Sequence, residues 1–176
     1  MNIKNAKKKL REARFFLSHM IEQERMAGDE EPFNFYLSAF LSAGMSVRDA
    51  FHVEQDRNRN NAIKAWKKVW EVRLTPEEKR LYDFMREDRK HEVHRSGSSR
   101  KAGTENRELG PGTHKLASGT MEVFGPPGVS PLATIQTPAY YFTIAGTERK
   151  ATEACEEYLA LLRQMVAKFR ADYAES

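Results

Sequence analysis

The sequence predicts a mainly α-helical protein, an antiparallel bundle of about five helices with a β-hairpin inserted before the last helix. Three observations predict it. Apolar residues recur at three- and four-residue spacing over most of the first 95 positions. A stretch rich in glycine, serine and proline follows, with alternating residues typical of strands. Helical spacing then returns. We expect a single domain over 1–176, with a four-helix portion (1–95), a mobile loop plus hairpin (96–146) and a C-terminal helix (147–176).

The first two helices are predicted over 3–27 and 32–56. Gly28 and Asp29 end the apolar periodicity of the first, and Pro32 suits the first turn of the second. The second helix has an apolar stripe and, on another side, a set of small residues. These are Ser38, Ala39, Ser42, Ala43 and Ser46. Because small side chains let a neighbouring helix approach closely, we expect this to be the central helix.

The third and fourth helices are predicted over 61–74 and from Pro76 to about Arg95. In the third, Trp66, Val69 and Trp70 should face inward with Ile63, and Lys64, Lys67 and Lys68 should face solvent. The fourth begins at the clearest local signal in the chain, Thr75-Pro76-Glu77-Glu78. Threonine is a good N-cap, proline suits the first helical position, and a glutamate three residues after the cap completes a capping box.

The remaining segments predict strands and a last helix. Residues 96–115 are rich in glycine, serine and charge and are typical of a mobile loop. Alternation over 116–125 and 132–145 predicts a β-hairpin, with 125–131 as its loop. Pro138 should then lie on an edge or at a bulge. Thr147 is the expected cap of a helix over 148–173.

The composition limits the class of protein. The chain has 176 residues, 40% of them apolar, which is enough to form a core. No apolar run approaches the roughly 20 residues of a membrane span, and no apolar stretch follows the basic N-terminus as it would in a secretory signal. With one cysteine, Cys155, no intramolecular disulfide forms. We therefore expect a cytoplasmic protein with no membrane association.

The charge is uneven along the chain. Lys plus Arg number 29 and Asp plus Glu number 25, for a net charge of +4. Residues 1–100 hold 21 basic and 16 acidic side chains, whereas the remainder holds 8 and 9. The segment from Arg86 to Lys101 contains six basic and three acidic residues. This local excess favours an anionic partner.

The densest polar cluster lies near the end of the fourth helix. On a helical wheel, Asp88 falls on the apolar face and Arg89 at its edge, while His91 and His94 lie together on a different side. The segment Asp88-Arg89-x-x-x-Val93-His94 resembles the Arg-x4–6-His signature of HEPN domains, which are helical bundles with this motif late in the chain. Elsewhere, segments such as 35–43 are similar to uncharacterised bacterial proteins of the same length, a likeness that implies no activity.

The HEPN resemblance implies an RNA-directed protein, and many members of that family are metal-independent ribonucleases paired with an antitoxin. Two motifs face each other across a homodimer. Carried over, His94 is the general acid/base and Arg89 stabilises the phosphate charge, with Asp88 as an orienting residue and no cofactor or metal. The expected nucleic-acid contacts are Arg86, Lys90, Arg95, Arg100 and Lys101.

Two features depart from the family pattern. The residue after the arginine is usually Asn, Asp or His, whereas Lys90 stands there in this chain. Arg86 and His91 have the same spacing as Arg89 and His94, so either pair is a candidate. A purely structural alternative also stays open, in which Arg89 bridges a carboxylate inside the bundle and His94 stabilises the helix C-terminus.

Three further interpretations remain. His91 and His94, three residues apart, could hold a metal if a third ligand came from elsewhere. The aromatic residues of the hairpin could pair with another chain, which would make the protein a non-catalytic adaptor. These are Phe124, Tyr140, Tyr141 and Phe142. A basic block near the N-terminus is another candidate surface for an anion. Its members are Lys7, Lys8, Lys9, Arg11 and Arg14.

Overall fold

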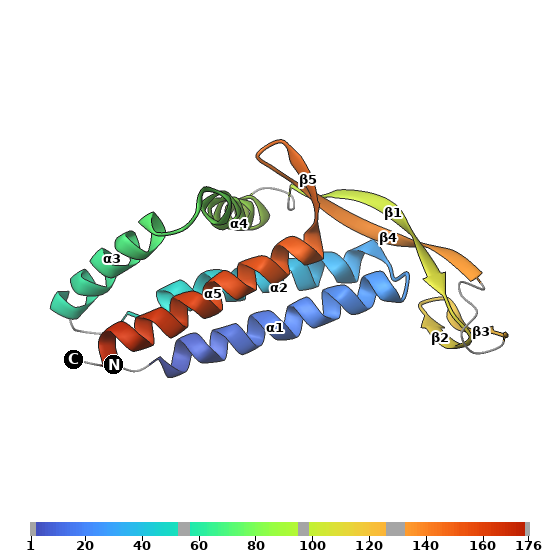
Figure 1. The fold of residues 1–176 in the computed structure, drawn as a ribbon, viewed down its shortest axis with the longest axis horizontal. Coiled ribbons are helices and arrows are strands. Elements are labelled where there is room, and N and C mark those ends of the chain that lie inside the picture. Colours follow the sequence, from blue (N-terminus) through green and yellow to red (C-terminus); the bar gives the residue numbers. More distant parts are fainter. Residues whose placement is uncertain (1–2, 53–56, 95–98, 126–132, 175–176) are drawn as a thin grey trace.

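The computed structural model describes residues 3–52, 57–94, 99–125 and 133–174, with the side chains of 92–94 and 174 outside the description (Figure 1). Its helices are α1 (Lys4–Arg25), α2 (Glu30–Asp49), α3 (Arg57–Val72), α4 (Pro76–His94) and α5 (Ala151–Ala174). Its strands are β1 (Lys101–Leu109), β2 (Gly112–Leu116), β3 (Gly119–Val123), β4 (Ala133–Ile144) and β5 (Thr147–Lys150). The described chain is thus mainly helical, with five helices and antiparallel strands before the last one, as predicted.

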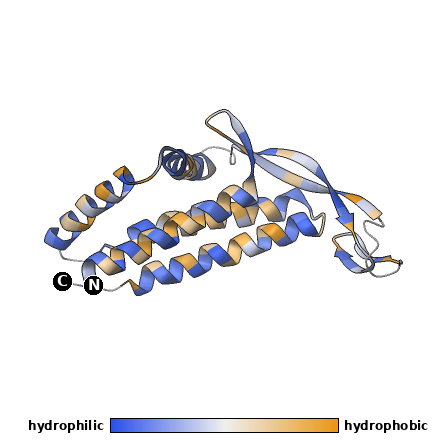
Figure 2. Cartoon of the chain, in the orientation of Figure 1, coloured by the Kyte–Doolittle hydropathy of each residue, from blue (hydrophilic) through white to orange (hydrophobic). Residues whose placement is uncertain are grey.

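Helices α2 and α5 lie inside the bundle, because each contacts the other as well as α1 and α4. The two pack closely at Gly44, where a Cβ would lie 2.9 Å from Cε1 of Tyr158 on α5. Phe40 meets the same Tyr158 ring edge-on, with 6.3 Å between centroids. Apolar positions recur in bands along α1, α2 and α5 (Figure 2), and these bands form the core. None of the described helices has the length and apolar character needed to cross a membrane.

Helix α3 joins the core at one end through an aromatic cluster. Phe51 stacks on Phe169 with centroids 4.2 Å apart, and Trp66 meets Phe169 edge-on at 4.9 Å. The predicted orientation of α3 is wrong at two positions. Val69 is 50% exposed, whereas Lys67 is only 3% exposed. The buried residues of α3 are Ile63, Lys67 and Trp70, so the alkyl stem of Lys67 completes the inward stripe.

Helix α4 begins as the sequence predicts. The Thr75 N–H donates to Oε2 of Glu78 at 2.8 Å, and the Glu78 N–H donates to Oγ1 of Thr75 at 3.3 Å. This reciprocal pair is a capping box, which satisfies two of the helix's unpaired N–H groups. The helix then runs to His94 and carries the candidate motif on its last turns.

Two predictions about the strands are wrong. Residues 101–109 are not a mobile loop but strand β1, which pairs with β4 along its whole length. The expected hairpin between 116–125 and 132–145 does not form, because β3 pairs with β2 instead and β4 lies between β1 and β5. Both errors have one cause: β1 is polar and gains its stability from β4, whose paired residues lie 24 to 40 positions away in the chain. Most of the predicted 125–131 loop lies outside the described residues.

The turn between β4 and β5 corrects a third prediction. Ala145 and Gly146 both have positive φ, at 51° and 83°. Two consecutive residues in this region form the tight turn that the twist of a β-hairpin favours. Thr147 therefore opens β5, opposite Ile144, rather than capping a helix. Helix α5 starts at Ala151.

The sheet is attached to the helices by aromatic pairs. Tyr140 on β4 stacks on Phe33 of α2 with 3.9 Å between centroids, and Phe142 meets Phe84 of α4 at 5.0 Å. Residues 133–140 of β4 pair with β1 but not with β5, so β1 and β4 form a two-stranded ribbon there. Pro138 lies in this ribbon, and its outer side has no strand partner among the described residues, in agreement with the predicted edge position.

The β2–β3 hairpin lies at the far end of the ribbon (Figure 1). It is tied to the end of α1 by the Ala117 N–H, which donates to the Met26 carbonyl at 2.6 Å. The Arg107 guanidinium of β1 donates to the Arg25 carbonyl. The last turn of α1 therefore fixes the position of the ribbon.

Candidate functional site

The predicted motif lies on the last turns of α4, and its first residue, Asp88, is a buried carboxylate. Asp88 is 1% exposed, and its Oδ1 accepts hydrogen bonds from both the N–H and the hydroxyl of Ser99, each at 2.7 Å. A buried carboxylate needs such donors. Asp88 thus fastens Ser99, just before β1, to α4, whereas its expected orienting role toward Arg89 and His94 stays a prediction.

The arginines of the motif are half-buried. Arg89 has a buried Nε without a hydrogen-bond partner among the described residues, and so does Arg86. The Arg86 guanidinium lies over the Tyr82 ring, 5.7 Å from its centroid. His91 is exposed. The side chain of His94, like the whole of Arg95, lies outside the described residues, so the geometry of the Arg89–His94 pair stays a prediction.

The other expected nucleic-acid contacts have acidic partners within the chain. Lys90 pairs with Glu87 at 2.6 Å, and Lys101 pairs with Glu148 at 3.0 Å. Arg100 donates to Glu30 at 2.8 Å and lies over the Tyr140 ring. The hydrogen bond from Arg100 holds the pKa of Glu30 below its ordinary value. These pairs offset much of the local positive charge that the sequence shows.

Unpaired cations lie elsewhere, where α1 and α5 run beside each other. Lys7, Arg163 and Arg170 line a groove of about 450 Å³ whose floor is apolar. The floor residues are Ile3, Leu10, Val166, Ala167 and Ala171. Arg14 and Arg163 line the adjoining hollow. We call this surface the α1–α5 seam and define it by Lys7, Arg14, Arg163 and Arg170. All four are exposed, and none makes an ion pair within the described part of the chain.

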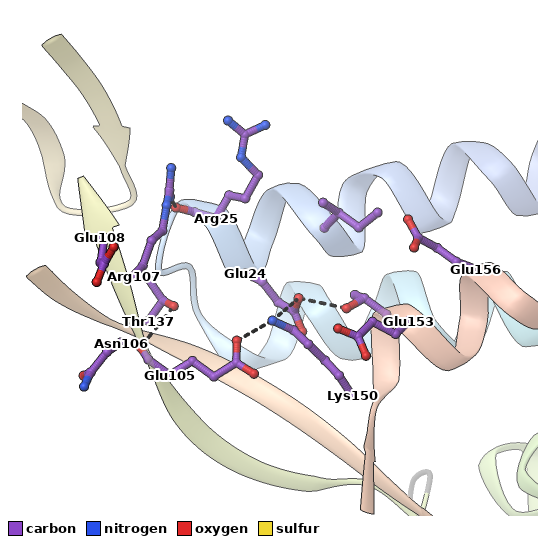
Figure 3. A pocket seen from close by; sticks show the side chains of 12 residues that line it. Glu24, Arg25, Glu105, Asn106, Arg107, Glu108, Thr137, Lys150, Glu153 and Glu156 are labelled. Atoms are coloured by element: carbon purple, nitrogen blue, oxygen red, sulfur yellow. Dashed lines mark hydrogen bonds and ion pairs between the residues drawn. The ribbon is translucent and has the colours of Figure 1, made fainter. Parts of the chain in front are cut away.

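Carboxylates gather at the opposite end of the same two helices, beneath the sheet (Figure 3). Glu24, on the last turn of α1, is 7% exposed. Its Oε2 accepts from the Thr152 hydroxyl at 3.0 Å and lies 3.7 Å from Nζ of Lys150. Lys150 also pairs with Glu105 of β1, whose other oxygen accepts from the Tyr141 hydroxyl at 2.8 Å. The network therefore joins α1, β1, β4 and β5.

The pKa values follow from this network. Burial raises the pKa of Glu24, although Lys150 and the Thr152 hydroxyl favour its charged form. The hydrogen bond from Lys150 lowers the pKa of Glu105. Burial and the Glu105 hydrogen bond raise the pKa of Tyr141 to about 12.

Neither a metal centre nor a reactive thiol is built from the residues that the structure describes. Among them, no group of three His, Cys, Asp or Glu side chains could hold a metal ion. Cys155 is fully buried in α5, and burial raises the pKa of its thiol well above the ordinary value. This favours a packing role over a nucleophilic one.

No family model matches the chain, and neither the curated proteins nor the solved structures include one that is significantly similar to it.

Sequence reasoning missed the carboxylate pocket but had one signal for it. Glu24 continues the inward stripe of α1 after Leu17 and Met20, so a carboxylate was placed on an apolar face. A charged residue in such a stripe needs a buried partner or a ligand. Lys150 and Glu105 could not be assigned to it, because each comes from a strand whose pairing depends on the fold.

Proposed function

We propose that this chain is an RNA-directed binding protein that holds the RNA backbone along the α1–α5 seam. One observation carries the proposal. The seam presents exposed cations on two helices that contact each other, and these cations have no carboxylate partner within the described chain. The HEPN resemblance supplies the preference for RNA. A cytoplasmic location is part of the same proposal.

The seam suits a phosphate backbone for physical reasons. Cations that neutralise phosphates release condensed counterions, which favours binding without regard to sequence. Arg163 and Arg170 are separated by about 10 Å along the α5 axis. Lys7 and Arg14 face them from α1. Glu156 also lines the hollow at Arg14 and Arg163, but it forms no ion pair with either arginine among the described residues, so little is lost when these cations turn to a ligand.

Replacing the charged residues of the seam by neutral ones should lower the affinity for RNA and make that affinity less dependent on salt concentration. For Arg163→Gln/Arg170→Gln we expect the slope of log K against log salt concentration to fall by about 1.4, since each contact with single-stranded RNA contributes about 0.7. Fluorescence anisotropy with a labelled 20-nucleotide single-stranded RNA at several KCl concentrations measures this slope.

The matched control is Lys90→Gln/Lys101→Gln, which removes two cations that are already paired with Glu87 and Glu148. We expect the control to keep most of the wild-type slope. A seam variant with the wild-type slope, or an equal loss in both variants, would contradict the assignment of the seam.

The HEPN resemblance extends this proposal to cleavage. His94 would act as general acid/base and Arg89 would stabilise the phosphate charge, in a homodimer restrained by an antitoxin-like partner. Asp88, whose Oδ1 accepts two hydrogen bonds from Ser99, is the positioning residue in this arrangement.

His94→Ala should abolish any ribonuclease activity. We expect RNA cleavage by the wild-type chain in the presence of EDTA, with cyclic phosphate ends, and a loss of at least about 100-fold in His94→Ala because a general acid/base is removed. Product ends are identified by mass spectrometry, and circular dichroism checks folding. His91→Ala is the control, and it also tests the Arg86–His91 alternative. Full activity in His94→Ala would exclude the Arg89–His94 pair.

A second candidate is a non-catalytic adaptor that pairs through the β1–β4 ribbon. The outer edge of β1 has no strand partner among the described residues, and an open edge is where an extended segment can add. The hairpin aromatics contribute less than expected, since Tyr140 and Phe142 are buried against the helices and Phe124 alone is highly exposed, at 83%.

The adaptor candidate is tested by adding positive charge to the β1 edge. If two copies pair through this edge, Thr104→Lys/Asn106→Lys should convert a dimer into a monomer, because like charges would meet across the strands. Light scattering after size-exclusion chromatography measures the mass, and Glu122→Lys on β3 is the control. A dimer that survives in the double variant rules out pairing at this edge.

A further inference from the structure

The carboxylate of Glu24 is only partly satisfied. Its Oε2 has the Thr152 hydroxyl and Lys150 beside it, whereas Oε1 is fully buried and makes no well-aligned hydrogen bond to any described residue. The backbone N–H of Tyr140 is the one further donor near the carboxylate among the described residues. The side chain is more than nine-tenths buried. A buried carboxylate oxygen that lacks a well-aligned donor is unfavourable, so a donor from a ligand would be favourable at this position.

Glu24 lines an open pocket of about 550 Å³ under the sheet (Figure 3). This volume lies within the range of small-ligand sites. The walls are the end of α1, strand β1, Thr137 of β4 and the start of α5. Glu24 lies close to Lys150, while Glu153 and Glu156 project from α5 (Figure 3).

The pocket is anionic overall. Five carboxylates line it against three cations. Glu108, Glu153 and Glu156 are exposed and form no ion pair with the described residues. Two of the three cations are engaged: Lys150 is held by Glu24 and Glu105, and Arg107 donates to a backbone carbonyl. With Arg25 counted as well, the five carboxylates and three cations leave the lining with a net charge of −2 when all are ionised. The unpaired carboxylates therefore determine the sign of the field inside the pocket.

We propose that this pocket binds an organic cation of the alkylammonium or guanidinium class, with Glu24 accepting a hydrogen bond from its innermost N–H group. Both groups carry several N–H donors and no acceptor, so they match a site that offers carboxylate oxygens. A metal ion fits less well, since no three described ligating side chains converge. An anion would face the carboxylates of both walls.

The charge of Lys150 does not prevent this binding. Lys150 lies between Glu24 and Glu105, and the three together carry one negative charge when all are ionised. The free carboxylates of Glu153 and Glu156 add to it at the mouth. An elongated cation could place one end at Glu24 and a second charge near these two. The proposal does not depend on RNA binding at the seam, which uses other residues.

Titration calorimetry on the full chain tests the proposal with matched probes. Agmatine, spermidine and arginine supply free cations, and short peptides with one central arginine or lysine supply the same groups on a polypeptide. Citrulline, which has the shape of arginine without its charge, is the control ligand. We expect at least one cation to bind about tenfold or more tightly than its neutral control. Binding of the free amines alone assigns a small-molecule ligand, and binding of the peptides alone assigns a polypeptide.

Variants link the binding to the pocket. Glu24→Gln keeps the size of the side chain and should weaken the cation by about tenfold or more. Glu153→Gln/Glu156→Gln changes only exposed residues and should weaken cation binding several-fold. If Glu24→Gln fails to fold, this second variant still shows whether the cation binds in the pocket. Glu122→Gln on β3 should leave binding unchanged. The proposal is overturned if no cation exceeds its neutral control, or if the cation binds the pocket variants as well as the wild type.

Discussion

Phe33→Ala should lower the free energy of unfolding by about 3–5 kcal/mol, the range for removal of a large buried aromatic side chain. Phe33 is 0% exposed and stacks on Tyr140 at 3.9 Å, so its removal leaves a cavity between α2 and the sheet. The loss should extend to the attachment of the sheet, because this pair is one of two aromatic contacts that hold β4 to the helices. Chemical denaturation followed by circular dichroism measures the change in stability.

Phe35→Ala provides a matched control on the same helix. Phe35 is 65% exposed, and its removal should change the stability by less than about 0.5 kcal/mol. Hydrogen exchange should show faster exchange of β4 amides in Phe33→Ala but not in Phe35→Ala. Equal stability of the two variants would mean that Phe33 does not occupy the core position described above.

The wild type should gain free energy of unfolding at alkaline pH as the buried Lys67 loses its proton, and Lys67→Met should lack this gain. Lys67 is 3% exposed, and burial lowers its pKa from 10.5 to about 8. In the unfolded chain the pKa returns near 10.5, so between about pH 8 and 10.5 the unfolded state binds more protons at this site. Stability from Lys67 therefore rises with pH in that window and is absent below it.

We expect the difference in free energy of unfolding between Lys67→Met and the wild type to shrink by about 2 kcal/mol from pH 7 to pH 10. This is less than the change in the Lys67 pKa would give on its own, because solvent screens part of the charge. At pH 7 the variant should be the more stable protein, since it buries no charge. Urea denaturation of both proteins at each pH measures this. The comparison must be between the two proteins, because burial raises the pKa values of Cys155 and Tyr158 and these groups destabilise the fold at high pH. A pH-independent difference would show that Lys67 is not desolvated.

The helices were predictable because their signals are local. The capping box at Thr75 and Glu78 fixes the start of α4 from four consecutive residues. Strand β1 gives no such signal, since its sequence is polar and its one deeply buried residue is Leu109. Its structure depends on pairing with β4, which no nearby residue specifies. The rotation of α3 was missed for a related reason: the stem of Lys67 packs as an apolar side chain, and periodicity read by residue type cannot register that.

The candidate sites also divide into features with a local sequence signal and features that depend on the fold. The motif on α4 was visible because its residues are close in sequence. The α1–α5 seam combines a basic block that was visible with two arginines from the other end of the chain, and the fold alone decides which cations keep internal partners. The carboxylate pocket needs α1, β1, β4, β5 and α5 to meet, so only Glu24, a charge in an apolar stripe, marked it in advance.

The place of α5 in the core has a consequence for how the chain is made. Helix α5 supplies Tyr158, Leu162 and Phe169 to the core, yet it leaves the ribosome after α1 to α4. Helix α1 can cover much of α2 early, but at 5–20 residues per second the side of α2 around Gly44, which packs on Tyr158 of α5, waits on the order of ten seconds for its partner. The nascent chain therefore exposes this side of α2 during that interval, and we expect it to depend on chaperones then. Chains released before α5 is complete should aggregate rather than fold.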